Sequence, residues 1–213
     1  MADRLGDCVR WGQRLLKRLG RWRYAWNRWA TWPRRATGNL ALAPGVRLYV
    51  PLRCDGEGKV RVGEKTRLGC RNSVQYGNGS ILLQARDSKS SIQIGRNCAF
   101  SNNVSIVSME FVEIGDDCLI GELVSIMDSD FHGIDPDKRR SDAVQSAPVK
   151  LENNVWLGSR VIIQKGVTVG ANSIITPNAV VTASVPANTI AGGIPARVIR
   201  ELTQSSSPLP DRP

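Results

Sequence analysis

The sequence predicts an all-β fold, a three-sided stack of short parallel strands, because its apolar residues repeat every six positions. Residues 151–186 read in sixes as LENNVW, LGSRVI, IQKGVT, VGANSI, ITPNAV and VTASVP. An aliphatic residue begins each unit, and a Val, Ser or Ala follows four positions later. An α-helix would repeat apolar residues every three to four positions and an extended strand every two. A period of six therefore indicates short strands joined by tight corners, with both repeated residues facing inward.

The size of the chain is consistent with such a stack. Three strands close a triangular coil, and successive coils pair about 4.8 Å apart. One coil of about eighteen residues has no core of its own, so several must stack before any is stable. The chain has 213 residues, enough for one substantial domain or two small ones, and we predict that the stack spans residues 36–202.

The first 35 residues form a basic arm. They hold ten Lys or Arg and two Asp, and so carry +8 of the net charge of +10. Apolar residues recur at spacings of three, four or seven, at Leu5, Cys8, Leu15, Leu19, Trp22, Trp26 and Trp29. This pattern predicts a short amphipathic α-helix that ends at Pro33. Such a helix suits the surface of an anionic membrane, and the alternative is that its apolar stripe packs on the domain or on a neighbouring subunit. The arm has no recognised DNA- or RNA-binding motif, so we expect no nucleic-acid partner.

Residues 36–55 are rich in Gly and Pro and are interpreted as a turn-rich lead-in to the repeats. Periodicity begins near Val60 and weakens over residues 80–93, where Ser80 and Arg86 occupy the opening positions. The last residues, 203–213, are rich in Ser and Pro and are predicted to be disordered.

Extra residues interrupt the repeat at three points. The counts from Arg86 to Ile94 and from Ile106 to Ile114 exceed six by two, and the count from Ile126 to Leu151 exceeds it by nineteen. All three insertions follow the third strand of a coil, so we predict that they project from one edge of the stack. The longest is a polar loop over residues 129–148, and long loops on a rigid scaffold are usually functional.

The cysteines and the apolar segments indicate a reduced compartment. Five cysteines without a CxxC pattern argue against a disulfide framework, and Cys98 and Cys118 fall on inward small positions. There is no apolar run of eighteen residues and no apolar segment typical of a secretory signal. We therefore expect a cytoplasmic protein.

The single histidine, His132, lies in the long loop within the run Asp128-Ser129-Asp130-Phe131-His132. An imidazole can remove a proton from a hydroxyl at neutral pH as that hydroxyl attacks a thioester. A carboxylate beside it would fix its tautomer, and Asp130 and Asp128 are the candidates, although both could equally cap the loop.

The run 128–132, the segment Asn153-Asn154-Val155-Trp156-Leu157-Gly158-Ser159 and the closing run 191–200 (AGGIPARVIR) together resemble the maltose, galactoside and polysaccharide-biosynthesis O-acetyltransferases. The resemblance covers about residues 56–202. It implies a left-handed parallel β-helix of hexapeptide repeats and a homotrimer, with CoA in the groove between neighbouring subunits. It also implies direct transfer of an acetyl group from acetyl-CoA to a hydroxyl, without a covalent enzyme intermediate.

The resemblance assigns roles to particular residues. His132 becomes the general base and Asn102 matches an asparagine of the acceptor side, while the choice between Asp130 and Asp128 as the carboxylate beside the imidazole stays open. Trp156 lines the thioester end of the groove, and backbone groups near Ser159 and Pro177 bond the pantetheine arm. The residues expected at CoA, by resemblance or because cations pair with its phosphates, are Trp156, Ser159, Lys165, Pro177, Thr182, Arg197 and Arg200.

Several of these residues also have ordinary structural explanations. Trp156 could pack against a neighbouring subunit, Asn102 could occupy a left-handed corner, and the two arginines could belong to a solvated tail. The chain has Thr182-Ala183 where the family often has Thr-Lys, so one phosphate contact is missing or supplied elsewhere.

We therefore expect an acetyl-CoA-dependent O-acetyltransferase that acts on a sugar hydroxyl in surface polysaccharide or glycolipid biosynthesis. The basic arm would hold it at the inner face of the plasma membrane, near a lipid-linked substrate. The alternatives are an N-acetyltransferase of an amino sugar and a catalytically silent scaffold bound to membrane. No metal is expected, because the zinc chemistry known on this kind of prism requires three histidines and the chain has one.

Overall fold

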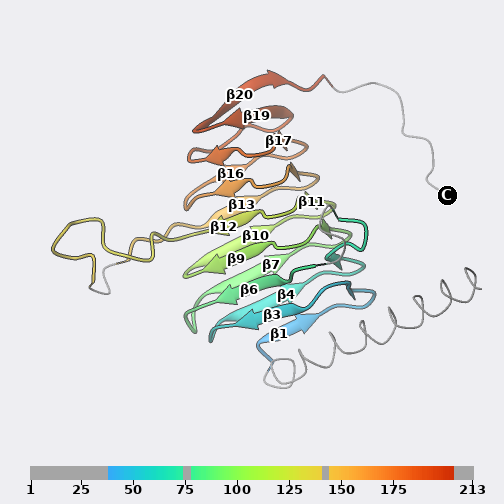
Figure 1. The fold of residues 1–213 in the computed structure, drawn as a ribbon, viewed down its shortest axis with the longest axis horizontal. Helices are drawn as coiled ribbons and strands as arrows, with labels where there is room; N and C mark the ends of the chain where they lie inside the picture. The colour runs from blue at the N-terminus through green and yellow to red at the C-terminus, as the bar shows by residue number, and fades with distance from the viewer. Residues whose placement is uncertain (1–37, 74–77, 141–143, 204–213) are drawn as a thin grey trace, which may run out of the picture.

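The computed structural model describes residues 38–73, 78–140 and 144–203 of the chain. These residues form a stack of flattened coils (Figure 1). The predicted basic helix of residues 1–35 and residues 204–213 of the predicted tail lie outside the described residues.

Three sheets form the three sides of the stack, and all pairs between successive coils are parallel. Side A consists of β1 (Leu40–Leu42), β4 (Lys59–Val62), β7 (Ser91–Ile94), β10 (Phe111–Ile114), β13 (Val149–Leu151) and β16 (Thr168–Val169). Side B consists of β2 (Arg47–Leu48), β5 (Arg67–Leu68), β8 (Ala99–Phe100), β11 (Leu119–Ile120), β14 (Trp156–Leu157), β17 (Ile174–Ile175), β19 (Thr189–Gly193) and β20 (Ala196–Glu201). Side C consists of β3 (Leu52–Asp55), β6 (Ile81–Ala85), β9 (Ser105–Ser108), β12 (Ser125–Met127), β15 (Ile162–Ile163) and β18 (Val180–Val181).

Coils 1 to 6 each take one strand from each side in chain order, so that coil 1 is β1–β3 and coil 6 is β16–β18. After coil 6 the chain adds β19 to side B and turns back, and β20 pairs with β19 antiparallel. This arrangement confirms the predicted all-β, three-sided stack and is consistent with a left-handed β-helix. None of the described residues belongs to a helix long and apolar enough to cross a membrane.

The core consists of the two repeated positions that the sequence predicts to face inward. The residues that open the six units are fully buried: Leu151, Leu157, Ile163, Val169, Ile175 and Val181. The residues four positions later are buried as well: Val155, Val161, Val167, Ser173, Ala179 and Val185. Each buried aliphatic side chain contributes roughly 1.5–3 kcal/mol relative to an exposed one. The polar member, Ser173, donates a hydrogen bond from Oγ to the Pro186 carbonyl (2.7 Å).

The corners need backbone conformations that few residues adopt. Asn154, Arg160, Asn172 and Asn178 have φ between 58° and 63°. Asn is among the few non-glycine residues that enter this left-handed region readily. The asparagines spaced along the repeats therefore mark the turns between sides.

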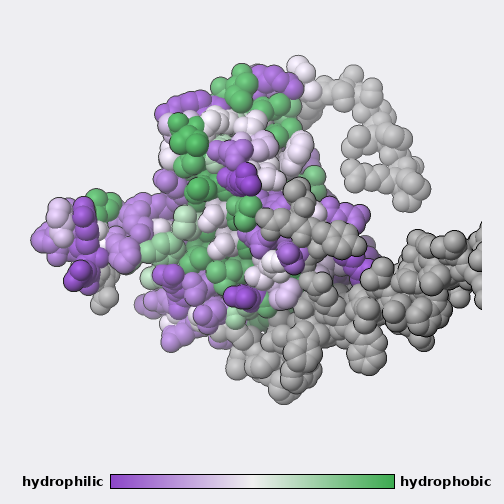
Figure 2. Space-filling view, viewed as in Figure 1, coloured by the Kyte–Doolittle hydropathy of each residue, from purple (hydrophilic) through white to green (hydrophobic). Residues whose placement is uncertain are grey.

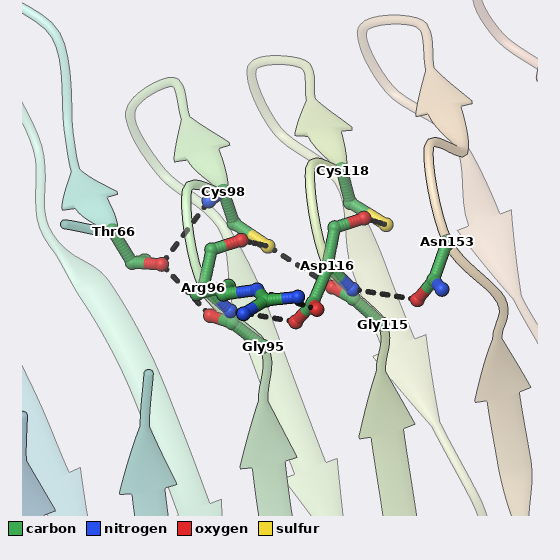
Figure 3. Close-up of polar contacts among 8 residues, drawn as sticks. All are labelled: Thr66, Gly95, Arg96, Cys98, Gly115, Asp116, Cys118 and Asn153. Atoms are coloured by element: carbon green, nitrogen blue, oxygen red, sulfur yellow. Dashed lines mark hydrogen bonds and ion pairs between the residues drawn. The ribbon is translucent and has the colours of Figure 1, made fainter. Parts of the chain in front are cut away.

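Side chains tie successive coils together at the corner between sides A and B (Figure 3). Asp116 accepts a hydrogen bond from the Arg96 backbone NH (2.9 Å), and Asn153, one coil further on, accepts one from the Asp116 NH (2.9 Å). Cys98 and Cys118 lie inside this corner, where each thiol contacts a backbone carbonyl of the next coil, Gly115 (3.1 Å) and Glu152 (3.2 Å) respectively. Both cysteines are buried at inward small positions, as the repeat predicts.

Two expectations about the first half of the stack are wrong. Residues 36–55 are not a lead-in, because β1, β2 and β3 form a complete first coil. In the second coil the residues that point inward are Ile81, Leu83 and Ala85, not Ser80 or Arg86. The two Gly and two Pro in residues 36–55 indicate turns. The coil forms nevertheless, because apolar side chains between these turns, such as Val46 and Leu48, are buried in the core.

The three predicted insertions do share one edge, because they separate β6 from β7, β9 from β10 and β12 from β13, at the corner between sides C and A. A fourth insertion, which the repeat does not reveal, lies at another edge. Leu68 and Leu83 lie fifteen residues apart, whereas their counterparts on the next coil, Phe100 and Ile106, lie six apart. This insertion leaves the corner between sides B and C. The long loop does project from the corner between sides C and A, after β12 and before β13, where Figure 1 shows it extending away from the stack.

Candidate active site

The long loop is anchored at its base by a buried carboxylate. Asp128 is fully buried, and its oxygens accept hydrogen bonds from Ser108 Oγ (2.8 Å) and from the backbone NH groups of Met109 (2.7 Å) and Glu110 (2.9 Å). A buried charge without partners would be costly, and these three donors satisfy it. The start of the loop is therefore fixed to the preceding coil.

Further contacts join the two ends of the loop. Asp130 NH donates to the Gln145 carbonyl (3.1 Å), and Ser146 Oγ donates to Glu110 Oε2 (2.9 Å). Lys165, on the next coil, donates from Nζ to the Asp130 carboxylate (2.5 Å) and to Gln145 Oε1 (3.3 Å). The loop consequently leaves the stack through a narrow neck held from the coils on both sides.

His132 lies just beyond this neck and is exposed, on a loop that is largely hydrophilic in Figure 2. The preceding Phe131 has φ of 63°, and the Arg86 guanidinium lies 4.3 Å from its ring centroid, a cation–π contact. The Nδ1 atom of His132 lies 3.2 Å from the Arg139 carbonyl oxygen. A carbonyl can only accept, so Nδ1 carries a hydrogen, and in the neutral ring the lone pair is then on Nε2. This geometry gives the loop an exposed group able to accept a proton.

A carboxylate does not orient this imidazole, contrary to the expectation for Asp130 and Asp128. The Asp130 carboxylate is paired with Lys165, and that of Asp128 is buried among its three donors. Both carboxylates instead position the loop that carries His132, whose Nδ1 faces a backbone carbonyl.

Most of the expected CoA residues lie along side B. Trp156 points outward with half of its surface exposed (50%), between Leu119 and Ile174 of the adjacent strands. These residues belong to an outward apolar stripe, which consists of Ala99, Leu119, Trp156, Ile174 and Ile190. Such a stripe offers an apolar surface to a ligand or to another chain.

Ser159 and Pro177 are stacked at the corner between sides B and C. The Ser159 carbonyl accepts a hydrogen bond from the Asn178 NH (2.9 Å). Pro177 lies directly over Gly158, where an added Cβ would approach its nitrogen to 2.6 Å. Glycine at position 158 is therefore required for the close approach of the two coils at this edge.

Arg197 and Arg200 lie on β20, at the far end of the same side, and both are exposed. Their guanidinium groups donate to neighbouring backbone carbonyls, Arg197 to Ala196 (2.8 Å) and Arg200 to Glu201 (3.2 Å). Within residues 38–203, as far as they are described, neither arginine has a carboxylate partner. Two cationic groups are thus available beyond Trp156.

Lys165 and Thr182 do not join this group. They follow Ile163 and Val181, at the corner between sides C and A, and the ammonium of Lys165 is engaged by Asp130 and Gln145. In this structure Lys165 holds the loop, and its pairing with a phosphate stays a prediction. The expected CoA residues of one chain therefore occupy two separate edges.

The Asn102 amide holds an insertion of the stack. Its side chain is fully buried, Oδ1 accepts a hydrogen bond from the Cys70 NH (2.8 Å) and Nδ2 donates to Ser73 Oγ (2.7 Å). The amide is therefore occupied with holding the insertion between β5 and β6 and does not face an acceptor. The sequence does not predict the contacts of Asn102 with Cys70 and Ser73, because the insertion has no repeat that would show which coil it lies against.

Comparisons with known proteins match this architecture. The family model described as bacterial transferase hexapeptide (six repeats) matches residues 148–183. Galactoside O-acetyltransferase of Escherichia coli K12 is 42% identical over 113 residues, which are 53% of this chain and 55% of the relative. The putative lipopolysaccharide biosynthesis O-acetyl transferase WbbJ of the same organism is 35% identical over 68 residues, 32% of this chain and 33% of the relative. The chain thus spans about half the length of the first of these relatives and about a third of the second.

Solved structures show the same fold over a larger share of the chain. A hexapeptide-repeat-containing acetyltransferase of Vibrio cholerae, VCA0836, complexed with acetyl coenzyme A, is 26% identical with a TM-score of 0.54, over 78% of this chain and 74% of the other. A galactoside acetyltransferase in complex with coenzyme A is 31% identical with a TM-score of 0.50, over 75% of this chain and 66% of the other. The six-residue repeat, the three parallel sheets and these similarities agree, and the chain belongs to the hexapeptide-repeat acetyltransferase family.

Proposed function

We propose that this chain is an acetyl-CoA-dependent acetyltransferase that O-acetylates a sugar, with His132 as general base. The observation that carries the proposal is the position of His132, which is exposed on a loop held at both ends and has Nδ1 3.2 Å from the Arg139 carbonyl oxygen. The similarity to galactoside O-acetyltransferase, and to solved relatives bound to acetyl-CoA or CoA, supports the donor.

In the proposed reaction a sugar hydroxyl oxygen attacks the carbonyl carbon of the thioester. His132 Nε2 accepts the hydroxyl proton as the new C–O bond forms, because a neutral alcohol is a poor nucleophile. The C–S bond then breaks, and the departing CoA thiolate takes the proton from the imidazolium. The acetyl group is thus transferred to the sugar oxygen as an ester, and CoA is released as the free thiol.

CoA would lie along side B of one subunit, with the thioester near Trp156 and the phosphates near Arg197 and Arg200. The base lies on another edge, so the site needs a second copy, and we propose a homotrimer. A rotation axis parallel to the stack keeps equivalent coils at equal height. The loop of His132 leaves coil 4, the coil of Leu119 on side B. A neighbour's imidazole would therefore reach side B next to Leu119, one coil below Trp156.

The proposed acceptor is a sugar of a surface polysaccharide or glycolipid precursor. The similarity to a relative named for lipopolysaccharide biosynthesis supports this class. The charge of residues 1–35, +8, supports a location at the inner face of the plasma membrane, although this segment lies outside the described residues.

The test is release of free thiol from acetyl-CoA with a panel of sugars, comparing wild type with His132→Ala. Loss of a general base should lower the rate about 10²- to 10⁴-fold. The side chain is exposed, so the thermal unfolding midpoint should not change. An amino sugar in the panel separates O- from N-acetylation by the stability of the product to hydroxylamine. An unchanged rate in His132→Ala would contradict the proposal and favour a silent scaffold.

A further inference from the structure

A hollow of about 400 Å³ lies on side B below the apolar stripe, within the range typical of small-molecule sites. It spans coils 1 to 3 at the edge where the insertion between β5 and β6 leaves the stack. The described residues that line it are Tyr49, Arg67, Gly69, Cys70, Arg71, Asn72, Ala99 and Phe100. The sequence alone does not reveal this hollow, because the Gly and Pro of residues 36–55 indicate turns and the insertion carries no six-residue repeat.

The hollow is positively charged. Arg67 and Arg71 are both exposed and lie in its wall, and Arg47 stands next to Arg67 on the adjacent strand. No Asp or Glu is among the described lining residues, and in the described part of the chain neither Arg67 nor Arg71 forms an ion pair. Among the described residues, the Arg67 and Arg71 guanidinium groups therefore present donors without a carboxylate partner to whatever enters the hollow.

The wall is also held in place. The Arg71 guanidinium carbon lies 5.4 Å from the centroid of the Tyr49 ring, a cation–π contact that joins the insertion to coil 1. The buried Asn102 amide holds the same insertion through the Cys70 NH (2.8 Å) and Ser73 Oγ (2.7 Å). The fully buried Asn102 thus fixes the segment that carries Arg71, and the two arginines face the hollow from different elements.

The height of the hollow relates it to the proposed reaction. On side B the hollow lies at coils 1 to 3, Leu119 at coil 4 and Trp156 at coil 5. The arginines proposed for the CoA phosphates lie beyond Trp156, at the opposite end of the side. A neighbour's His132 at coil 4 would therefore stand between the CoA above it and the hollow below it, where the acceptor must approach.

We propose that this hollow binds a phosphate group carried by the acceptor sugar, so that the substrate is a sugar phosphate or a sugar linked through a diphosphate. The proposal rests on the proposed function, because it assigns the hollow to the acceptor of that reaction. A phosphate monoester carries about two negative charges at pH 7 and can use both guanidinium groups, whereas a carboxylate is satisfied by one. The Tyr49 ring adds a flat surface for the sugar or the base attached to it.

The proposal is tested with glucose, glucuronate, glucose 1-phosphate and UDP-glucose as acceptor probes. Wild type should prefer the two phosphate-bearing probes over glucose in kcat/KM. In Arg67→Gln and Arg71→Gln the KM for glucose 1-phosphate should rise about 10- to 100-fold, and the preference over glucose should approach one. The matched control is Arg61→Gln, an exposed arginine of the same coil on side A, which should keep the preference.

Three outcomes would overturn the proposal. One is a preference for phosphate that survives in both variants. Another is glucuronate acting as well as glucose 1-phosphate. The third is an equal rise in KM for acetyl-CoA, which would assign the arginines to the donor instead. A comparison of glucose 1-phosphate with UDP-glucose identifies whether the phosphate is terminal or nucleotide-linked, and either result retains the proposal.

A binding measurement separates this proposal from the proposed function. If no acceptor gives thiol release, the acetyltransferase assignment fails, but calorimetric titration with glucose 1-phosphate still tests the hollow. Binding to wild type that is lost in the Arg67→Gln/Arg71→Gln double variant, and retained in Arg61→Gln, would support the phosphate site by itself. Equal heats for all three proteins would reject it.

Discussion

Two aspartates of the long loop have different surroundings, and this difference predicts their effects on stability. The Asp128 carboxylate is buried and accepts three hydrogen bonds, whereas Asp135 forms an ion pair with Lys138 (2.9 Å) with more than half of both side chains exposed. Asp128→Ala would leave three donors unsatisfied, so we expect a loss of about 3 kcal/mol or more in the free energy of unfolding. Urea unfolding at one fixed protein concentration measures it.

The control is Asp135→Ala in the same loop, which should change stability by at most about 1 kcal/mol, because exposed ion pairs contribute little. Asp128→Ala should also lower turnover, since it releases the neck next to His132. Equal stability of the two variants would contradict the anchoring role of Asp128.

Cys98, which is buried in the corner between sides A and B, should be chemically inert. Contact with the Cys118 thiol and burial both raise the pKa of Cys98. The thiolate is the reactive form, so a raised pKa keeps the thiol protonated and unreactive at neutral pH. We expect maleimide to modify Cys70, which is partly exposed, while Cys98 stays unmodified in the folded protein. Peptide mapping by mass spectrometry measures this, and urea should expose Cys98. Rapid labelling of Cys98 without denaturant would contradict its position in the corner.

At the scale of the strand, inward and outward residues of one type should differ strongly in their contribution to stability. Ile163 and Ile162 are adjacent in β15, and Ile163 is fully buried while Ile162 is partly exposed on the outer face. Ile163→Ala should cost about 2–5 kcal/mol, because the rigid coil cannot collapse into the cavity. Ile162→Ala is the matched control and should cost about 1 kcal/mol or less. Chemical unfolding measures the free energy of unfolding of both variants. A larger loss in Ile162→Ala than in Ile163→Ala would contradict the register of side C.

The regular part of the fold could be predicted because its signal is repeated and local. Each unit of residues 151–186 has its own aliphatic and small residue, and the buried rows of Leu151 and Val155 follow directly from the period. The insertion after Leu68 lacks such a signal. The register of β6, the strand that follows this insertion, is set by its pairing with β9 on the next coil. In that pairing Leu83 lies opposite Ile106, and no local sequence pattern specifies this contact.

The candidate site could be predicted only in part for the same reason. Being the only histidine, His132 was identifiable from composition and from its position in an insertion. The partners of the polar residues were not, because Asp130 and Lys165 lie 35 positions apart and meet only when two coils stack. The charged hollow combines three coils, so its residues, Tyr49, Arg67 and Arg71 among them, have no common motif.

For the whole molecule, the basic arm should act independently of the stack. Residues 1–35 carry ten Lys or Arg, and each basic residue near an anionic surface contributes about 1 kcal/mol at best. Deletion of residues 1–35 should abolish sedimentation with vesicles containing phosphatidylserine and leave thiol release with a soluble acceptor unchanged. Vesicles of phosphatidylcholine alone serve as the control, and binding should weaken as salt is raised. Sedimentation retained after the deletion would contradict a membrane role for the arm.

The assembly itself can be tested by complementation between two inactive variants. The proposed site takes His132 from one chain and Trp156 with Arg197 from its neighbour, since the loop and side B occupy different edges of one stack. His132→Ala therefore removes the loop's contribution at each interface between subunits (each seam), and a Trp156→Ala/Arg197→Ala variant removes the contribution of side B. In a trimer that contains both variants, one of the three interfaces pairs an intact loop with an intact side B, so trimers purified through both tags should recover about a third of the wild-type rate.

The comparison requires trimers that contain both variants. The two variants are therefore co-expressed with different affinity tags, and the trimers are purified through both tags. The same variants mixed after separate purification, without unfolding, are the control and should remain inactive. Recovery occurs only if the two halves come from different chains, because a site contained within one chain would be damaged in every subunit. Doubly tagged trimers without activity would therefore place the imidazole and the CoA surface in the same subunit and overturn the seam.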